Sequence, residues 1–313
     1  MAAHTTCTAK ESTSRGASRP AAHLVPLTLA ADDAATTGQP TLFLVHAIGG
    51  SVHTYATLAK SVKDVCSVVG IEAFGLYGEH EPVDALDEIV ERYVAAVRAA
   101  SPHGPYRLGG WSMGGIVAFE MARRLEQDGA EVAFVAILDS PFTLSWADLG
   151  FGSFGEVSDG QGDTAPLMAR FAEDVADSLG WSVPATGPAV TDPLGWLAET
   201  IAGDGREREA RGHIEAMRAE LQRRFLVFRA HAEALAHYAP SGPITADLLL
   251  LTPDRSSNVG SAQRWAGQTR GQAHHAHVHG DHYTFLRAPV VGEVAALIRT
   301  ASRRHEARVS HDG

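Results

Sequence analysis

The chain has 313 residues, 45% of them hydrophobic and 20% charged, enough for one large α/β domain or two small ones. A formal net charge of −11, without a basic stripe, makes a nucleic-acid partner unfavourable. Residues 1–22 lack the apolar segment of a secretory signal, and no run approaches the roughly 20 apolar residues of a membrane span. Two cysteines do not suggest a disulfide framework, which fits a reducing cytoplasm. From these features together we expect a cytoplasmic protein that does not bind membranes.

Short apolar runs alternate with helical patterns over the first half of the chain. Residues 1–22, rich in Ala, Ser and Thr, predict a disordered tail. Because the apolar runs are continuous rather than alternating, they indicate parallel strands covered on both faces. The predicted strands are Thr41–His46, Cys66–Ala73, Tyr106–Gly109 and Val132–Leu138. The helices predicted between them lie near Ser51–Val62, over Leu86–Ala99 and from about Ser112 to Gln127.

The alternation stops at residue 142. Leu149–Gly162 predicts a mobile loop, and amphipathic helices are predicted at Leu167–Leu179 and Arg206–His237. Strands resume at Asp247–Leu251 and near His275–His279, before a helix at Pro289–Ala301. We therefore expect a sheet core made of residues 23–141 and 239–303, a helical lid inserted over 142–238, and a charged tail over 304–313.

The segment Gly110-Trp111-Ser112-Met113-Gly114 lies directly between a predicted strand and a predicted helix. In that context Gly-x-Ser-x-Gly is typical of a nucleophilic serine on a sharp, strained turn. An ordinary glycine-rich turn is the alternative. A serine nucleophile needs a base, and His282 is the best candidate because it follows the last predicted strand and precedes the last helix.

Two carboxylates compete as the group that orients His282. Asp139 ends one predicted strand, and Asp254 follows the next. Either can orient the imidazole and stabilise its cationic form, and the pattern alone leaves both open. For an oxyanion hole we expect two backbone amides, one from Met113 and the other from Ala47 or Ile48.

Two further patterns each have a functional interpretation and a purely structural one. Alternate histidines at positions 275, 277 and 279 share one face of a strand, but no clustered carboxylate or cysteine accompanies them, so we predict no metal site. Arginines stud the last lid helix and could dock an acidic partner, although interleaved glutamates favour a solvated face. These arginines are Arg206, Arg208, Arg211, Arg218, Arg223, Arg224 and Arg229.

The chain resembles the thioesterase domains that terminate polyketide, nonribosomal-peptide and fatty-acid synthases. The resemblance is carried by LFLVHAIGG (42–50), GPYRLGGWSMGGIVAFEMARRL (104–125), LDSP (138–141) and GDHYTFL (280–286). FRAHAEALAHYAP (228–240) looks like the end of such a lid. The resemblance implies an α/β-hydrolase fold, with a mostly parallel central sheet, helices on both faces and a helical lid.

The resemblance also bears on the acid. In chain-terminating members the acid follows the strand after the nucleophile helix, which corresponds to Asp139. In discrete editing thioesterases it lies one strand later, at Asp254. Those enzymes usually carry His before the serine, whereas this chain has Trp111 and a Gly-Gly pair after Met113, so the resemblance favours Asp139.

The function implied by this resemblance is release of an acyl chain from the phosphopantetheine arm of a carrier protein. Ser112 takes the acyl group, and His282 then activates water or a hydroxyl or amine of the chain, giving a free acid or a ring. The protein needs no cofactor of its own, and we expect a monomer or homodimer. The alternatives are a discrete editing (type II) thioesterase and a carboxylesterase acting on free small esters. The residues do not decide between hydrolysis and cyclisation, nor between a free-standing protein and an excised terminal domain.

Overall fold

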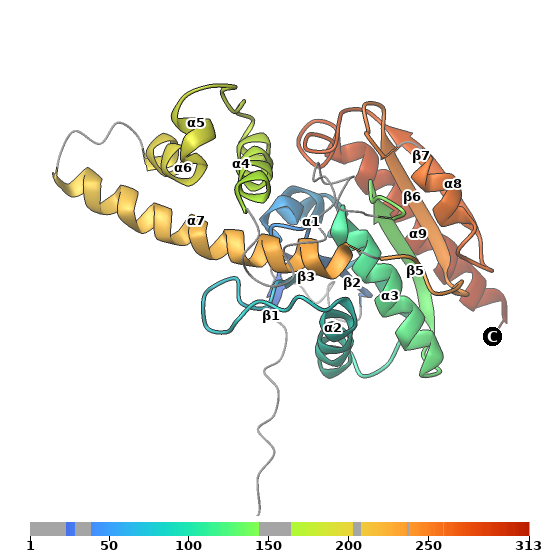
Figure 1. Ribbon diagram of the computed structural model, residues 1–313. Coiled ribbons are helices and arrows are strands. Elements are labelled where there is room, and N and C mark those ends of the chain that lie inside the picture. The colour runs from blue at the N-terminus through green and yellow to red at the C-terminus, as the bar shows by residue number, and fades with distance from the viewer. Residues whose placement is uncertain are drawn as a thin grey trace, which may run out of the picture.

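The computed structural model describes residues 23–28, 39–143, 164–202, 208–236, 238–258 and 260–312. Its centre is a seven-stranded sheet in the order β1-β3-β2-β4-β5-β6-β7, in which β1 pairs antiparallel with β3 and the other neighbours are parallel (Figure 1). This confirms the predicted fold class. The strands are β1 (His23–Pro26), β2 (Thr41–Val45), β3 (Ser67–Glu72), β4 (Tyr106–Trp111), β5 (Val132–Leu138), β6 (Asp247–Pro253) and β7 (Ala273–Val278).

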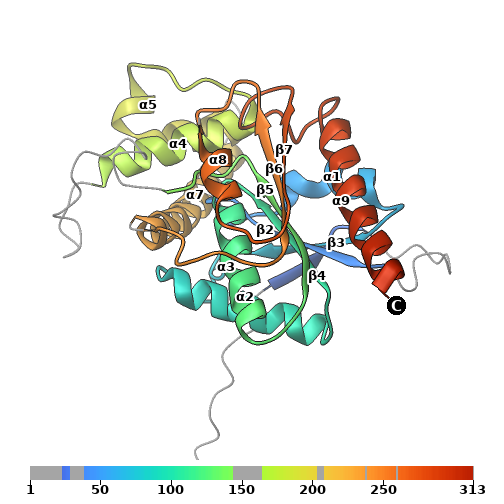
Figure 2. The same cartoon turned by 90° about the vertical axis from the view of Figure 1, so that its right-hand side faces the viewer.

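Helices cover both faces of the sheet, as Figure 2 shows. On one face lie α2 (Leu86–Ala100), α3 (Met113–Gln127) and the short α8 (Ser261–Ala266). On the other lie α1 (Ala56–Val62), which follows a 3-10 turn at His53–Tyr55, and α9 (Val291–Asp312).

The central strands are apolar throughout because each serves both cores. In β6, Leu248 and Leu250 pack into the core beneath α2 and α3, whereas Leu249 and Leu251 pack into the core beneath α1 and α9. All four side chains are at most 4% exposed. A strand buried on both faces therefore shows a continuous apolar run.

Between β5 and β6 the described residues form four helices: α4 (Ala165–Leu179), α5 (Pro188–Thr191), α6 (Pro193–Ala202) and α7 (Arg208–Leu235). Helices α4, α6 and α7 share a small core, in which Phe171 of α4 makes edge contacts with Phe225 and Phe228 of α7. The last turns of α7 return to the sheet domain, where Leu235 joins the core under α2 and α3 (Figure 1). We call these four helices the lid.

The sequence anticipates the two long lid helices but misses four shorter elements. β1 has four residues, all of them partly or fully exposed, so it lacks the apolar run that marks a buried strand. The others are α5, α6 and α8, of four, ten and six residues. The disordered tail expected over residues 1–22 and the loop expected over Leu149–Gly162 lie outside the described residues.

The predicted end of the last helix is wrong. The sequence predicts a helix ending at Ala301 and a charged tail from residue 304, whereas α9 continues to Asp312. The reason is that Ile298, Ser302 and His305 follow one face of the helix and are at most 8% exposed. Arg308, one turn further on, forms an ion pair with Asp247 at the start of β6. Among the described residues, no helix combines the length and the apolar character that a membrane span requires.

Candidate active site

Ser112 is the single residue between the end of β4 and the start of α3. Its backbone angles, φ of 57° and ψ of −125°, lie in a region that residues with a Cβ atom rarely adopt. A Cβ on Gly110 would lie 2.3 Å from the carbonyl carbon of Gly114, and one on Gly114 would lie 2.3 Å from the carbonyl oxygen of Val45. The backbone can make this turn only because both positions are glycine, which is the context that the sequence motif predicts.

A buried tyrosine fixes the strand that leads into this turn. The Tyr55 hydroxyl donates to the carbonyl oxygen of Val45 at 2.6 Å and accepts from the amide of Trp111 at 2.8 Å. Burial raises its pKa, so the phenol stays protonated. The Ser112 amide donates to Leu138 on the neighbouring strand at 3.0 Å. Tyr55 thus joins the ends of β2 and β4, a role that the sequence does not reveal because its partner Trp111 lies 56 residues away in the chain.

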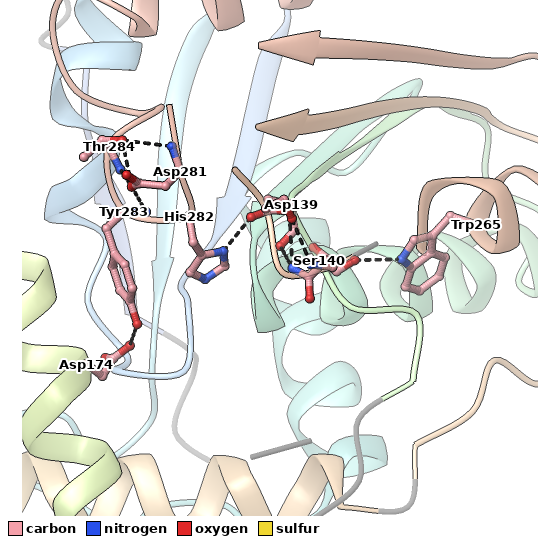
Figure 3. A network of polar contacts seen from close by, with 10 residues as sticks. Asp139, Ser140, Asp174, Trp265, Asp281, His282, Tyr283 and Thr284 are labelled. Atoms are coloured by element: carbon pink, nitrogen blue, oxygen red, sulfur yellow. Dashed lines mark hydrogen bonds and ion pairs between the residues drawn. The ribbon is translucent and has the colours of Figure 1, made fainter. Parts of the chain in front are cut away.

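His282 and Asp139 meet at the same edge of the sheet, from loops that follow β7 and β5 (Figure 3). The Nδ1 atom of His282 lies 2.7 Å from Oδ2 of Asp139. The Asp139 side chain is 1% exposed and that of His282 23%. Asp254, the alternative acid, follows β6 but is exposed. The carboxylate that contacts His282 is that of Asp139.

Two residues of the loop after β6 hold the other oxygen of Asp139. The Ser256 hydroxyl donates to Oδ1 at 2.5 Å, and Nδ2 of Asn258 lies 3.3 Å from the same atom. Asn258 Nδ2 also donates to the main-chain oxygen of Asp139 at 2.8 Å. Both oxygens of the carboxylate are therefore occupied, which fixes the one that faces His282. Sequence reasoning missed Ser256 and Asn258, whose signal is their position at the carboxyl end of a strand next to β5.

Asp281, next to His282, shapes the loop. Its Oδ1 accepts from the hydroxyl of Thr284 at 2.7 Å and from the amides of Thr284 and Tyr283 at 3.0 and 3.2 Å. Its Oδ2 pairs with Arg255 at 2.9 Å. Asp281 therefore closes the turn that presents His282, and its carboxylate is not free to orient the imidazole.

The lid contacts the loop that carries His282. The Tyr283 hydroxyl donates to Oδ1 of Asp174 in α4 at 2.9 Å (Figure 3). Burial raises the pKa of Asp174. Arg287 donates to the main-chain oxygens of Asp177 and Ser178 at the end of the same helix. The ring of Trp111, on the nucleophile strand, lies 5.0 Å from that of His282 between centroids.

The expected oxyanion loop follows β2. Among the described residues, no acceptor takes a hydrogen bond from the amides of Ala47, Ile48 or Met113. These three amides belong to residues beside the end of β2 and the start of α3, where Gly114 packs against the carbonyls of Val45 and His46. Unpaired amides at this sheet edge are suited to receive a developing negative charge.

The remaining candidates form no site of their own. His275 Nε2 lies 3.1 Å from the Thr252 hydroxyl, and His279 pairs with Glu293 at 2.8 Å. No group of three or more His, Cys, Asp or Glu in the described ranges is placed to hold a metal. The arginines of α7 whose side chains are described contact acidic partners: Arg218 with Asp192, Arg223 and Arg224 with Glu220, and Arg229 with Glu233.

Comparisons with known proteins agree with this architecture. Residues 40–148 match the family model described as thioesterase domain. The chain is 27% identical over 258 residues to the nonribosomal peptide synthetase pngA of Aspergillus terreus, covering 80% of this chain and 26% of that protein. It is 28% identical over 293 residues to the atromentin synthetase greA of Suillus grevillei, covering 88% and 28%. The chain thus spans about a quarter of the length of these relatives.

Solved structures show the same fold. A four-domain nonribosomal peptide synthetase bound to AMP and glycine is 25% identical, with a TM-score of 0.65 over 85% of this chain and 19% of that one. The Vlm2 thioesterase domain is 22% identical, with a TM-score of 0.65 over 90% of this chain and 98% of that one. The chain therefore matches the thioesterase domain family over residues 40–148 and has the α/β-hydrolase fold of the thioesterase domains of nonribosomal peptide synthetases.

Proposed function

We propose that the chain releases a polyketide or peptide acyl group from the phosphopantetheine arm of a carrier protein through an ester on Ser112. The observation that carries the proposal is the convergence of three elements at one sheet edge. They are a strained serine turn, a histidine held by the buried Asp139, and a loop whose amides have no acceptor in the described part of the chain. The synthetases to which the chain is related support a carrier-bound thioester as the acyl donor.

In the first half-reaction, Nε2 of His282 takes the proton of the Ser112 hydroxyl while Oγ attacks the thioester carbonyl. Asp139 accepts a hydrogen bond from Nδ1–H, which leaves Nε2 free for that proton and stabilises the imidazolium that forms. The amides of Met113 and of Ala47 or Ile48 bind the oxyanion. The C–S bond then breaks, the carrier thiol leaves with the proton from His282, and the acyl group stays on Ser112.

In the second half-reaction, His282 takes a proton from water or from a hydroxyl or amine of the acyl chain. That oxygen or nitrogen attacks the ester, the bond to Ser112 breaks, and the serine oxygen recovers the proton from His282. Water gives a free acid, whereas an internal nucleophile gives a ring. The lid bears on this choice because α4 contacts the loop of His282 and can limit the access of water.

The function is tested by comparing acyl N-acetylcysteamine thioesters with matched oxoesters, using the wild-type protein and Ser112→Ala. We expect the thioesters to react with the higher kcat/KM and the variant to lose turnover of both. Preference for simple oxoesters would favour a carboxylesterase. Full turnover by Ser112→Ala would rule out the covalent route.

The contact between Asp139 and His282 also argues against the discrete editing class, in which the resemblance places the acid at Asp254. Asp254 is exposed, and its amide bonds to Val278 on the neighbouring strand at 2.9 Å.

A further inference from the structure

A second histidine from the lid lies beside the oxyanion loop, and the mechanism above gives it no role. His231 belongs to α7, is 1% exposed, and contacts residue Ile48, which is 183 positions away in the chain. Its Nδ1 atom lies 2.7 Å from the carbonyl oxygen of Ile48. A carbonyl can only accept, so Nδ1 carries the hydrogen and donates it.

His46 holds the preceding peptide in the same way. Its Nδ1 lies 2.6 Å from the carbonyl oxygen of Ala47, and its Nε2 lies 2.6 Å from the hydroxyl of Tyr93. The rings of His46 and His231 stack with centroids 4.8 Å apart and an angle of 17° between their planes. Burial lowers the pKa of His46 to about 3 and that of His231 to about 4, so both rings are neutral at neutral pH. Neutral rings can stack at this distance without charge repulsion.

These two bonds constrain the amides of the oxyanion loop. In a trans peptide the C=O and the next N–H point in opposite directions within one plane. Holding the Ala47 carbonyl therefore directs the Ile48 amide, and holding the Ile48 carbonyl fixes the plane that follows it. Ile48 is also restrained through its side chain, which packs against the lid core of α4, α6 and α7. Its main chain and its side chain are thus both held by the lid.

We propose that His231 is a positioning residue that couples the docked lid to the oxyanion hole. His231 bonds the peptide that follows Ile48 and stacks on His46, which bonds the peptide that carries the Ile48 amide. The helix α7 thus restrains the loop on both sides of that amide, so the hole is fully formed only when the lid is in place. The proposal rests on the proposed acyl transfer at Ser112. It predicts that loss of the Nδ1 donor weakens stabilisation of the oxyanion more than it weakens substrate binding.

The test uses three variants of His231 and a matched control on the same helix. His231→Leu removes the donor at similar volume. His231→Asn keeps an N–H near the position of Nδ1, whereas His231→Gln moves it outward. His213→Leu changes an exposed histidine of α7. Circular dichroism and thermal unfolding establish that each variant folds.

Two readouts report the oxyanion hole itself. One is the rate at which an alkyl fluorophosphonate modifies Ser112, because that reaction also builds negative charge on an oxygen in the hole. The other is the infrared stretch of a ¹³C=O-labelled octanoyl ester on Ser112, formed from the N-acetylcysteamine thioester. Hydrogen bonds from the hole lower that frequency, and a purely structural role for His231 would leave it unchanged.

We expect His231→Leu to lower both the rate of phosphonylation and kcat by about 10- to 100-fold, with little change in KM. The same variant should raise the stretching frequency of the acyl carbonyl. His231→Asn should restore both, His231→Gln should not, and His213→Leu should match the wild type. A folded His231→Leu with wild-type rates and frequency would overturn the proposal. If His231→Leu does not fold, equal behaviour of the Asn and Gln variants would overturn it. If the wild-type protein is phosphonylated on Ser112 but does not turn over thioesters, that result would count against the proposed function alone.

Discussion

Replacing Asp139 by asparagine removes one charge from the contact with His282 and changes little else in shape. The asparagine amide has two ways to lie. With its oxygen toward His282, its NH2 group faces Nδ2 of Asn258, which is itself a donor 3.3 Å from the present oxygen. With its NH2 group toward His282, Nδ1 must become the acceptor, so that Nε2 carries the hydrogen. In that tautomer Nε2 cannot take the proton of Ser112.

Either arrangement also removes the carboxylate that stabilises the imidazolium. The carboxylate lies 2.7 Å from Nδ1 and is 1% exposed, so water cannot replace it. By analogy with the equivalent substitution in a serine protease, we expect kcat to fall by about 10³- to 10⁴-fold. Asp254→Asn, which changes an exposed side chain, should stay within about twofold.

The assay is steady-state hydrolysis of an octanoyl N-acetylcysteamine thioester by the wild-type protein, Asp139→Asn and Asp254→Asn, with thermal unfolding to verify the fold. If Asp254→Asn lost far more activity than Asp139→Asn, the assignment of the acid would be wrong. The protein would then be closer to the discrete editing thioesterases.

Three further predictions concern the fold around the site. Gly114→Ala places a Cβ 2.3 Å from the Val45 carbonyl oxygen, so we expect little folded protein by circular dichroism. Tyr55→Phe leaves the buried amide of Trp111 and the Val45 carbonyl without their partner and should lower the free energy of unfolding by about 2–5 kcal/mol in urea titrations. Burial lowers the pKa of His231 to about 4, below its unfolded value near 6.5, so its contribution to stability is present above pH 6.5 and lost as the pH falls toward 4. The urea midpoint of His231→Asn should therefore fall less between pH 7 and 4 than that of the wild type, and equal slopes would refute this.

The sheet could be predicted from the sequence because its strands are buried on both faces. Leu248 to Leu251 form an unbroken apolar run in which alternate residues enter different cores. The end of α9 could not be predicted in this way. The sequence places Arg308 in a charged, solvated tail, and only the tertiary structure shows that Asp247 of β6 lies beside it.

The positions of Ser112 and His282 follow from local order, since each lies between a strand and a helix. The choice between Asp139 and Asp254 does not, because both follow parallel strands that end at the same edge of the sheet. Tertiary structure separates them, since the loop after β6 directs Ser256 toward Asp139 and leaves Asp254 exposed. The catalytic role of Asp139 stays a prediction.

The contacts of His231 and Tyr55 lie beyond any local pattern. His231 meets Ile48 from 183 residues away, and Tyr55 meets Trp111 from 56 residues away. No local motif in the sequence marks either contact. Only the docking of α7 and the pairing of β2 with β4 bring them to the backbone of the site.

The proposed function depends on the transfer of an acyl chain from a carrier thiol to Ser112. Intact-protein mass spectrometry after mixing the chain with an octanoyl-loaded carrier protein tests this most directly. We predict that the protein gains the mass of one octanoyl group, that peptide mapping places it on Ser112, and that Ser112→Ala gains none. Turnover of the carrier thioester with no adduct on rapid quenching, together with full activity of Ser112→Ala, would contradict acyl transfer to Ser112.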